Sequence, residues 1–214
     1  MSISVDKNKK LFTLQTKNTT YQMKVGRFDH LYHIYYGKKI EHQDLSYLLY
    51  NGPSHYVPYP HESKGRVGSL TLMSQEYPTV GSGDLGSVAL DIKNHDGTRV
   101  VDLKYKNYEV IDGKYDLENL PSFFAKEDEA QTLKITLVDD VSGVEVELFY
   151  GVYAKYDVIT RAARLSNLGD SSLSIQKIQS LVLDLISGQY DLVHFHGRWG
   201  SERNFERIPL SHNV

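Results

Sequence analysis

The chain has 214 residues, no cysteine and a formal net charge of −3 at pH 7. The missing cysteines exclude disulfide bonds, and interspersed acidic and basic residues leave no basic stripe, so we expect no nucleic-acid partner. No apolar run approaches the roughly 20 residues of a membrane-spanning helix, and the first ten residues lack the apolar centre of a signal peptide. We therefore expect a soluble cytoplasmic protein with no membrane partner.

Alternation of apolar and polar residues predicts strands through most of the first half of the chain. The predicted strands are residues 10–16, 20–25, 31–37, 88–94, 98–106 and 107–113. The dipeptide Asp96-Gly97 predicts a hairpin between residues 88–94 and 98–106. Residues 41–75 lose the alternation but are rich in tyrosine, which predicts an ordered loop lying on the body of the protein or on a partner.

Four further alternating runs follow, at residues 131–140, 143–153, 157–167 and 173–186. No helical period separates them, so they predict an antiparallel meander with one face in the core and one face in solvent. The predicted fold class is all-β, and 214 residues can form a single β-sandwich domain.

Few residues in this sequence indicate a catalytic, metal-binding or ligand-binding role. His194 and His196 share one face of a predicted strand and could reach one metal ion, but the sequence shows no further ligand, so we expect no metal site. Asp139 and Asp140 are adjacent in a predicted turn and point to opposite sides, which argues against a catalytic carboxylate pair. Trp199, the sole tryptophan, has polar and glycine neighbours, which favours an exposed ring able to stack on a sugar or a partner.

Five ordered blocks of the sequence resemble a known family. They read FTLQTKNTTYQMKV, HLYHIYYGKKI, QEYPTVGSGD, YDVITRAARLSNLGD and HFHGRWGSERNFERIPL. Over residues 10–213 the chain resembles the N-terminal domain of retaining α-galactosidases of glycoside hydrolase family 36, the melibiase type. The resemblance implies a β-supersandwich of mostly antiparallel sheets over residues 1–214. It also implies that both catalytic aspartates belong to a (β/α)8 barrel that this chain does not contain, so no catalytic residue is expected here.

The resemblance implies a role for a few residues. Trp199 matches a tryptophan at the rim of the galactose pocket, and Arg203 and Glu206 would attach this segment to the barrel. The family places a sugar-binding carboxylate just before a run that matches residues 56–60. No acidic residue stands directly before that run, so Asn51 or Asp44 would take its place.

The resemblance also implies the setting of these residues. The substrate would be a terminal α-galactoside such as melibiose or a raffinose-type sugar, without a cofactor. The partners would be the protein's own barrel and, in the full-length enzyme, further copies in a homo-oligomer that is often a tetramer. The chain alone would be inactive. The alternative is a stand-alone carbohydrate-binding or structural β-sandwich module.

Overall fold

The computed structural model describes residues 2–41, 43–49, 73–81, 86–185 and 188–210. The chain divides into two compact units, Met1–Leu183 and Asp184–Val214. Among the described residues, none lies in a helix long and apolar enough to cross a membrane.

The described residues fold almost entirely into strands. The first unit contains β1 (Ile3–Asp6), β2 (Leu11–Gln15), β3 (Thr19–Val25), β4 (Leu31–Lys38), β5 (Leu90–Lys93), β6 (Lys104–Asp112), β7 (Gln131–Asp139), β8 (Val144–Tyr153), β9 (Val158–Asn167) and β10 (Ser174–Ile178). Its short 3₁₀ helices are η1 (Arg27–Asp29), η2 (Ser46–Leu48), η4 (Glu127–Glu129) and η5 (Ala154–Tyr156). The second unit contains β11 (Tyr190–Arg198) and β12 (Ser201–Leu210).

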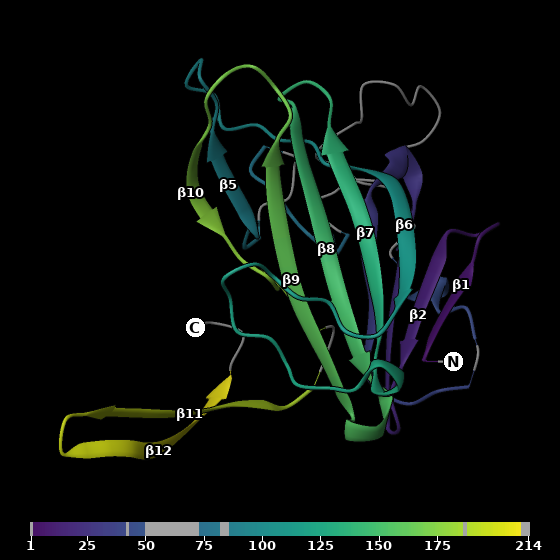
Figure 1. Ribbon diagram of the computed structural model, residues 1–214, viewed down its shortest axis with the longest axis vertical. Coiled ribbons are helices and arrows are strands. Elements are labelled where there is room, and N and C mark those ends of the chain that lie inside the picture. Colours follow the sequence, from purple (N-terminus) through teal and green to yellow (C-terminus); the bar gives the residue numbers. More distant parts are fainter. Residues whose placement is uncertain (1, 42, 50–72, 82–85, 186–187, 211–214) are drawn as a thin grey trace. The chain divides into compact units, whose positions relative to one another are not determined.

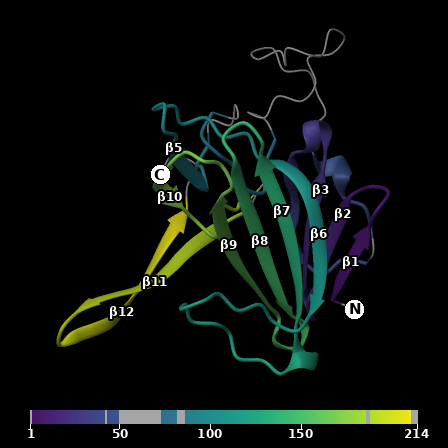
Figure 2. The same cartoon turned by 45° about the horizontal axis from the view of Figure 1, so that its top comes forward.

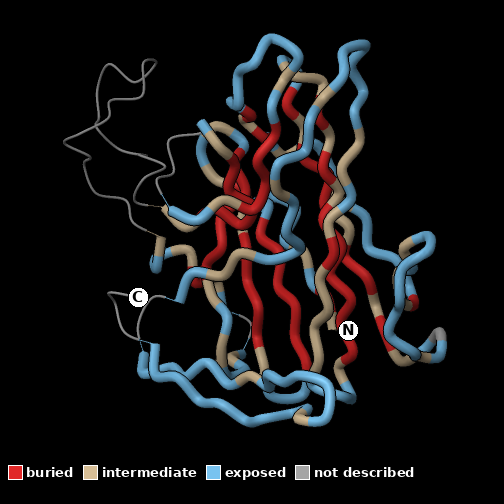
Figure 3. The backbone as a smooth tube through the Cα atoms, turned by 90° about the vertical axis from the view of Figure 1, so that its left-hand side faces the viewer, coloured by how far each residue is buried: buried red, intermediate tan, exposed pale blue. Residues whose placement is uncertain are grey.

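Two four-stranded antiparallel sheets form the body of the first unit, in the orders β1-β2-β3-β4 and β6-β7-β8-β9 (Figures 1 and 2). Apolar side chains from both sheets meet in one core, in which the rings of Phe12 and Tyr108 pack edge to face with centroids 5.2 Å apart. Figure 3 shows the buried stretches as long runs along the strands. The all-β, antiparallel, sandwich-like prediction is confirmed.

The pairing of β7 with β8 shows how the period-two pattern produces this core. Leu133 pairs with Tyr150, Ile135 with Leu148 and Leu137 with Val146, and all six side chains are buried. Because neighbouring positions point to opposite faces, the polar residues between them line the other side of the sheet. The turn that joins the two strands ends at Gly143, whose φ of 70° suits glycine.

The predicted four-strand meander is wrong in its last strand. β7, β8 and β9 form a meander as predicted, and β6 completes their sheet on the β7 side. β10 instead leaves the sheet and pairs with β5, where Ile175 lies opposite Ile92 and Ile178 opposite Leu90. β5 is buried at Leu90, Asp91 and Ile92, so its backbone amide and carbonyl groups need neighbouring strands, and strand pairing over such sequence distances leaves no local pattern.

The predicted hairpin after β5 is also wrong, although its turn forms. The Gly97 amide donates to the Asn94 carbonyl, but residues 98–103 are not in a strand. Thr79 forms an isolated parallel β-bridge with Leu90, so β5 pairs with this segment and with β10. The residues after the turn contact the 79–80 segment instead, because the Val101 amide donates a hydrogen bond to the Val80 carbonyl at 3.1 Å.

β1 was missed because four residues are too short to display a period. It pairs with β2 and extends the sheet at its edge. On the face of this sheet away from the main core, Leu11, Ile34 and Leu45 form a second small cluster. The sheet therefore has buried side chains on both faces.

Candidate functional site

Trp199 lies at the tip of the hairpin in the second unit. β11 ends at Arg198 and β12 begins at Ser201, so Trp199 and Gly200 form the connection between paired strands. The indole is 97% exposed, and Gly200 adopts a φ of 74° that glycine accepts without strain. The Gly200 amide donates to a Glu202 carboxylate oxygen at 2.9 Å, which ties the turn to β12. The sequence-based expectation of an exposed ring is met.

A bulge lies directly behind this turn. The strand register shifts between His196 and Arg198, and Arg203 adopts a left-handed φ of 58°. A Cβ at Gly197 would lie 2.7 Å from the Ser201 carbonyl oxygen, so only glycine fits there. The bulge increases the local twist of the hairpin and sets the direction in which its tip points.

Asp44 is already engaged in local contacts. One carboxylate oxygen accepts from the amide and the hydroxyl of Ser46, and the other forms an ion pair with the Lys9 ammonium at 3.1 Å. The hydrogen bonds from Ser46 lower the pKa of Asp44 to about 2, against a smaller effect of burial that raises it. Asp44 therefore is ionised and closes the turn before η2.

Asn51, the other candidate for the missing sugar contact, lies outside the described residues, as does the 56–60 run. The same holds for most of the tyrosine-rich stretch 41–75. Trp199 and Asp44 belong to different units, and each is placed only within its own unit.

Sequence reasoning missed a buried polar network inside the first unit. Its centre is Glu76, which is fully buried and accepts hydrogen bonds from the hydroxyls of Tyr21 at 2.7 Å and Tyr150 at 2.8 Å. An Arg161 nitrogen lies 3.0 Å from the same carboxylate, and the His33 Nδ1 lies 3.3 Å from its other oxygen. Glu76 lies in an irregular segment without alternation, so no local pattern indicated its burial.

Electrostatics keep this network charged. Burial alone would raise the pKa of Glu76, but the Arg161 guanidinium and the bonds from His33 and Tyr21 hold it below the usual value. Burial, together with the Glu76 charge, raises the pKa of both tyrosines well above 10. The cluster therefore is an ion pair with neutral tyrosine donors, and it joins β3, β8 and β9 across the sandwich.

Asp139 and Asp140 differ in burial and in their contacts. Asp139 is buried and accepts from the Val141 amide and the Ser142 hydroxyl within the β7–β8 turn, and from the Asp102 amide, which precedes β6. Asp140 is exposed. The two carboxylates therefore lie in different surroundings, one buried and bonded and the other open to solvent.

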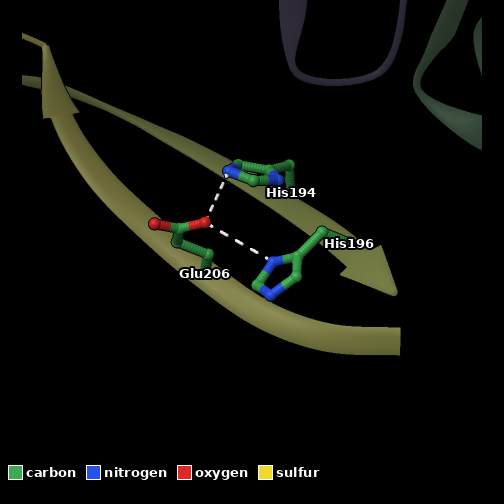
Figure 4. A group of neighbouring side chains, drawn as sticks. All are labelled: His194, His196 and Glu206. Carbon is green, nitrogen blue, oxygen red and sulfur yellow. Dashed lines mark ion pairs between the residues drawn. The ribbon is translucent and has the colours of Figure 1, made fainter. Parts of the chain in front are cut away.

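A third side chain joins the two histidines of β11. Glu206 in β12 places one carboxylate oxygen 3.1 Å from His194 Nε2 and 3.4 Å from His196 Nδ1 (Figure 4). The sequence pattern placed the two imidazoles on one face, but the strand pairing that supplies Glu206 was not visible in it. The register makes His194 and Glu206 direct cross-strand neighbours.

Comparison with known proteins gives the chain its family. The model of the glycosyl hydrolase family 36 N-terminal domain matches residues 29–213. The bifunctional alpha-galactosidase/sucrose kinase AgaSK of Mediterraneibacter gnavus is 43% identical over the whole chain, which covers 23% of that protein. Alpha-galactosidase AgaA of Geobacillus stearothermophilus is 36% identical over 98% of the chain, which covers 29% of its length.

Solved structures agree with these matches. The galactosidase domain of AgaSK superposes with a TM-score of 0.91 at 43% identity, over 98% of this chain and 29% of that one. A structure of an AgaA variant in complex with raffinose gives a TM-score of 0.86 at 36% identity, over 94% of this chain and 28% of that one. The chain thus spans about a quarter of the length of these relatives. It belongs to the glycosyl hydrolase family 36 N-terminal domain family.

Proposed function

We propose that this chain is the N-terminal domain of an α-galactosidase that hydrolyses terminal α-galactosyl residues of melibiose and raffinose-type sugars. The relatives named α-galactosidases support the reaction, and the AgaA variant solved with raffinose supports the sugar class. The proposed mechanism is a retaining double displacement through a covalent galactosyl-enzyme. Two aspartates of a separate barrel domain perform that chemistry, and this chain supplies neither.

The part of this domain in the reaction is to shape the rim of the sugar pocket. The observation that carries the proposal is the fully exposed indole of Trp199 at the tip of a bulged hairpin. A flat apolar ring packs against the C–H face of galactose and excludes water from one side of it. For the polar contact we favour Asn51 over Asp44, because both carboxylate oxygens of Asp44 already have partners.

The proposal extends to assembly and location. The tyrosine-rich stretch 41–75 would contact a neighbouring copy in a homo-tetramer of the full-length enzyme, and light scattering on that enzyme measures the copy number. A cytoplasmic location is supported by the absence of cysteine from all 214 residues, which suits a reducing compartment.

The role of Trp199 is tested in the full-length enzyme. Trp199→Ala removes a binding wall and leaves the proposed aspartates in place, so KM should rise and kcat/KM should fall. Losing an aromatic contact of about 1.5–3 kcal/mol corresponds to roughly 10- to 100-fold in kcat/KM. Phe124→Ala is the matched control, since this ring is also exposed but lies in the first unit, outside the hairpin.

The possible outcomes distinguish a failure of the proposed α-galactosidase function from a failure of the proposed role of Trp199. Activity that is unchanged in Trp199→Ala would contradict the rim role alone. A full-length protein without α-galactosidase activity would contradict the proposed function. Calorimetric binding of galactosides by the 214-residue chain itself would favour the stand-alone carbohydrate-binding module.

A further inference from the structure

The face of the hairpin formed by His194, His196 and Glu206 carries a set of metal-ligand side chains, here called the hairpin triad. One ligand atom from each residue lies within 4.8 Å of the other two. In Figure 4 both imidazoles point toward the same carboxylate oxygen, to which the two distances are 3.1 and 3.4 Å. Among the described residues, this is the one group of three or more histidine, cysteine, aspartate or glutamate side chains whose ligand atoms lie this close together.

The hairpin itself holds the triad in place. His194 and His196 are two positions apart on β11, so they share a face, and Glu206 is paired directly with His194 across the ladder. The bulge and the two-residue turn fix the strands just beyond His196. All three ligands come from one short ladder, so the site is complete within the second unit.

The distances suit a small tetrahedral ion. Zinc binds imidazole nitrogen and carboxylate oxygen at about 2.0–2.1 Å, which places neighbouring ligand atoms of a tetrahedron about 3.3–3.4 Å apart. Two of the three edges of the triad, at 3.1 and 3.4 Å, are already close to that length. The third requires only that two partly exposed imidazoles turn toward each other, which side-chain rotation allows.

The ligand types limit which metal ions suit the site. Two imidazoles with one carboxylate suit zinc and neighbouring first-row divalent ions, whereas magnesium and calcium prefer oxygen ligands throughout. We propose that the hairpin triad is a binding site for a first-row divalent cation, with zinc as the best match, that leaves a fourth position open to water. Such an ion would cross-link β11 to β12 beside the turn that carries Trp199. The metal-site proposal does not depend on the proposed function. A bound ion would affect Trp199 only by making the hairpin more rigid.

Calorimetric titration of the untagged 214-residue chain with zinc chloride tests the site. We expect one equivalent to bind with a micromolar Kd. His194→Gln, His196→Asn and Glu206→Gln each place an amide near the original ligand atom but remove a metal ligand. Loss of a group that merely orients a ligand costs about 10- to 100-fold in affinity, so each variant should lose at least tenfold. The exposed turn residue His95 gives the control His95→Gln, which should bind as the wild type does.

Trp199 supplies a second readout because it is the sole tryptophan and follows His196 by three positions. Copper(II) bound at the triad should quench its fluorescence saturably at one equivalent, and Glu206→Gln should need at least tenfold more copper for half-maximal quenching. Copper electron paramagnetic resonance of the wild-type chain should show two nitrogen ligands, a measurement that needs no variant. Absence of zinc binding below millimolar concentration, zinc affinity in all three variants equal to that of the wild type, or a copper spectrum without nitrogen couplings would overturn the proposal.

Discussion

Glu76 carries a charge inside the sandwich, and its neighbours decide whether that charge is stable. The Arg161 guanidinium faces it across 3.0 Å, and both side chains are almost completely inaccessible to solvent. Removing one member of such a pair leaves the other buried without a counter-charge. The network therefore holds β3, β8 and β9 together as long as all its members are present.

The substitution Glu76→Gln tests this dependence. It keeps the size of the side chain but leaves the Arg161 cation unpaired, so the free energy of unfolding should fall by about 3–5 kcal/mol. Urea denaturation at neutral pH measures the difference. The control Glu145→Gln breaks a pair with Lys106 that is partly open to solvent, and it should cost no more than about 1 kcal/mol. Equal effects of the two substitutions would contradict the role of the buried network.

Asp157 joins the β2–β3 turn to η5 from a left-handed backbone position with a φ of 59°. Its carboxylate accepts from the Thr16 hydroxyl, from both nitrogens of Asn18 and from the Thr19 hydroxyl. These bonds, led by that from Thr16, lower its pKa to about 2. Because the folded pKa lies below the unfolded value near 4, the contribution of Asp157 to stability is present above pH 4 and is lost as the pH falls toward 2.

The expected result is a difference between Asp157→Asn and the wild type that depends on pH. At pH 6 the variant should be less stable, because an amide cannot accept all the bonds that the carboxylate accepts. The gap should narrow as the pH falls from 4 to 2, where the wild-type carboxylate takes up a proton. Denaturant titrations across this range measure it, and a gap that stays constant down to pH 2 would show that the carboxylate charge is irrelevant.

Exposed residues such as Trp199 and buried polar residues such as Glu76 differ in how well the sequence predicts their surroundings. Trp199 was recognisable because its glycine and polar neighbours exclude a core position. Glu76 was not, because its partners lie in β3, β4, β8 and β9 and meet only after the sheets stack. The third member of the hairpin triad was hidden for the same reason, since Glu206 reaches the histidines only through strand pairing.

At the scale of elements, alternation located most strands but did not determine their partners. The positions of β7, β8 and β9 followed from their period and short turns, since adjacent strands with tight turns pair with each other. β10 has the same kind of pattern yet pairs with β5, which precedes it by the whole of another sheet. Side-chain period specifies which face is buried and leaves the choice of neighbour to long-range packing.

The two units should differ sharply in stability. The members of the main core all precede Asp184, whereas the hairpin β11–β12 exposes Val193, Phe195 and Phe205. A two-stranded hairpin on its own is marginally stable in water. The second unit therefore depends on its strand ladder, bulge and turn for order and has less stabilisation from apolar burial than the first.

Deleting residues 184–214 tests this division. The shortened chain should unfold in one cooperative transition, and its free energy of unfolding should change by no more than about 1 kcal/mol, the scale of changes at exposed positions. Urea denaturation followed by far-ultraviolet circular dichroism measures it. Loss of cooperativity, or a much larger loss of stability, would show that the hairpin is part of the core of the first unit.

For the whole molecule, we propose that the sandwich supports a sugar pocket and does not itself perform the reaction. Carboxylates that are prominent in the sequence or the structure, such as Asp139, Glu76 and Asp157, are engaged in structural hydrogen bonds or ion pairs. The chain spans about a quarter of the relatives it matches, and we assign the hydrolytic chemistry to a part beyond it. In the proposed function, this domain offers the exposed indole of Trp199, at the tip of a hairpin, to a sugar pocket that another domain completes.

Hydrolysis of a chromogenic α-galactoside by the 214-residue chain and by the full-length gene product is the most direct test. We predict no turnover by the chain at any concentration and turnover by the longer protein, because the proposed retaining mechanism assigns the catalytic aspartate pair to a separate barrel domain. Turnover by the 214 residues alone, or none by the longer protein, would contradict it.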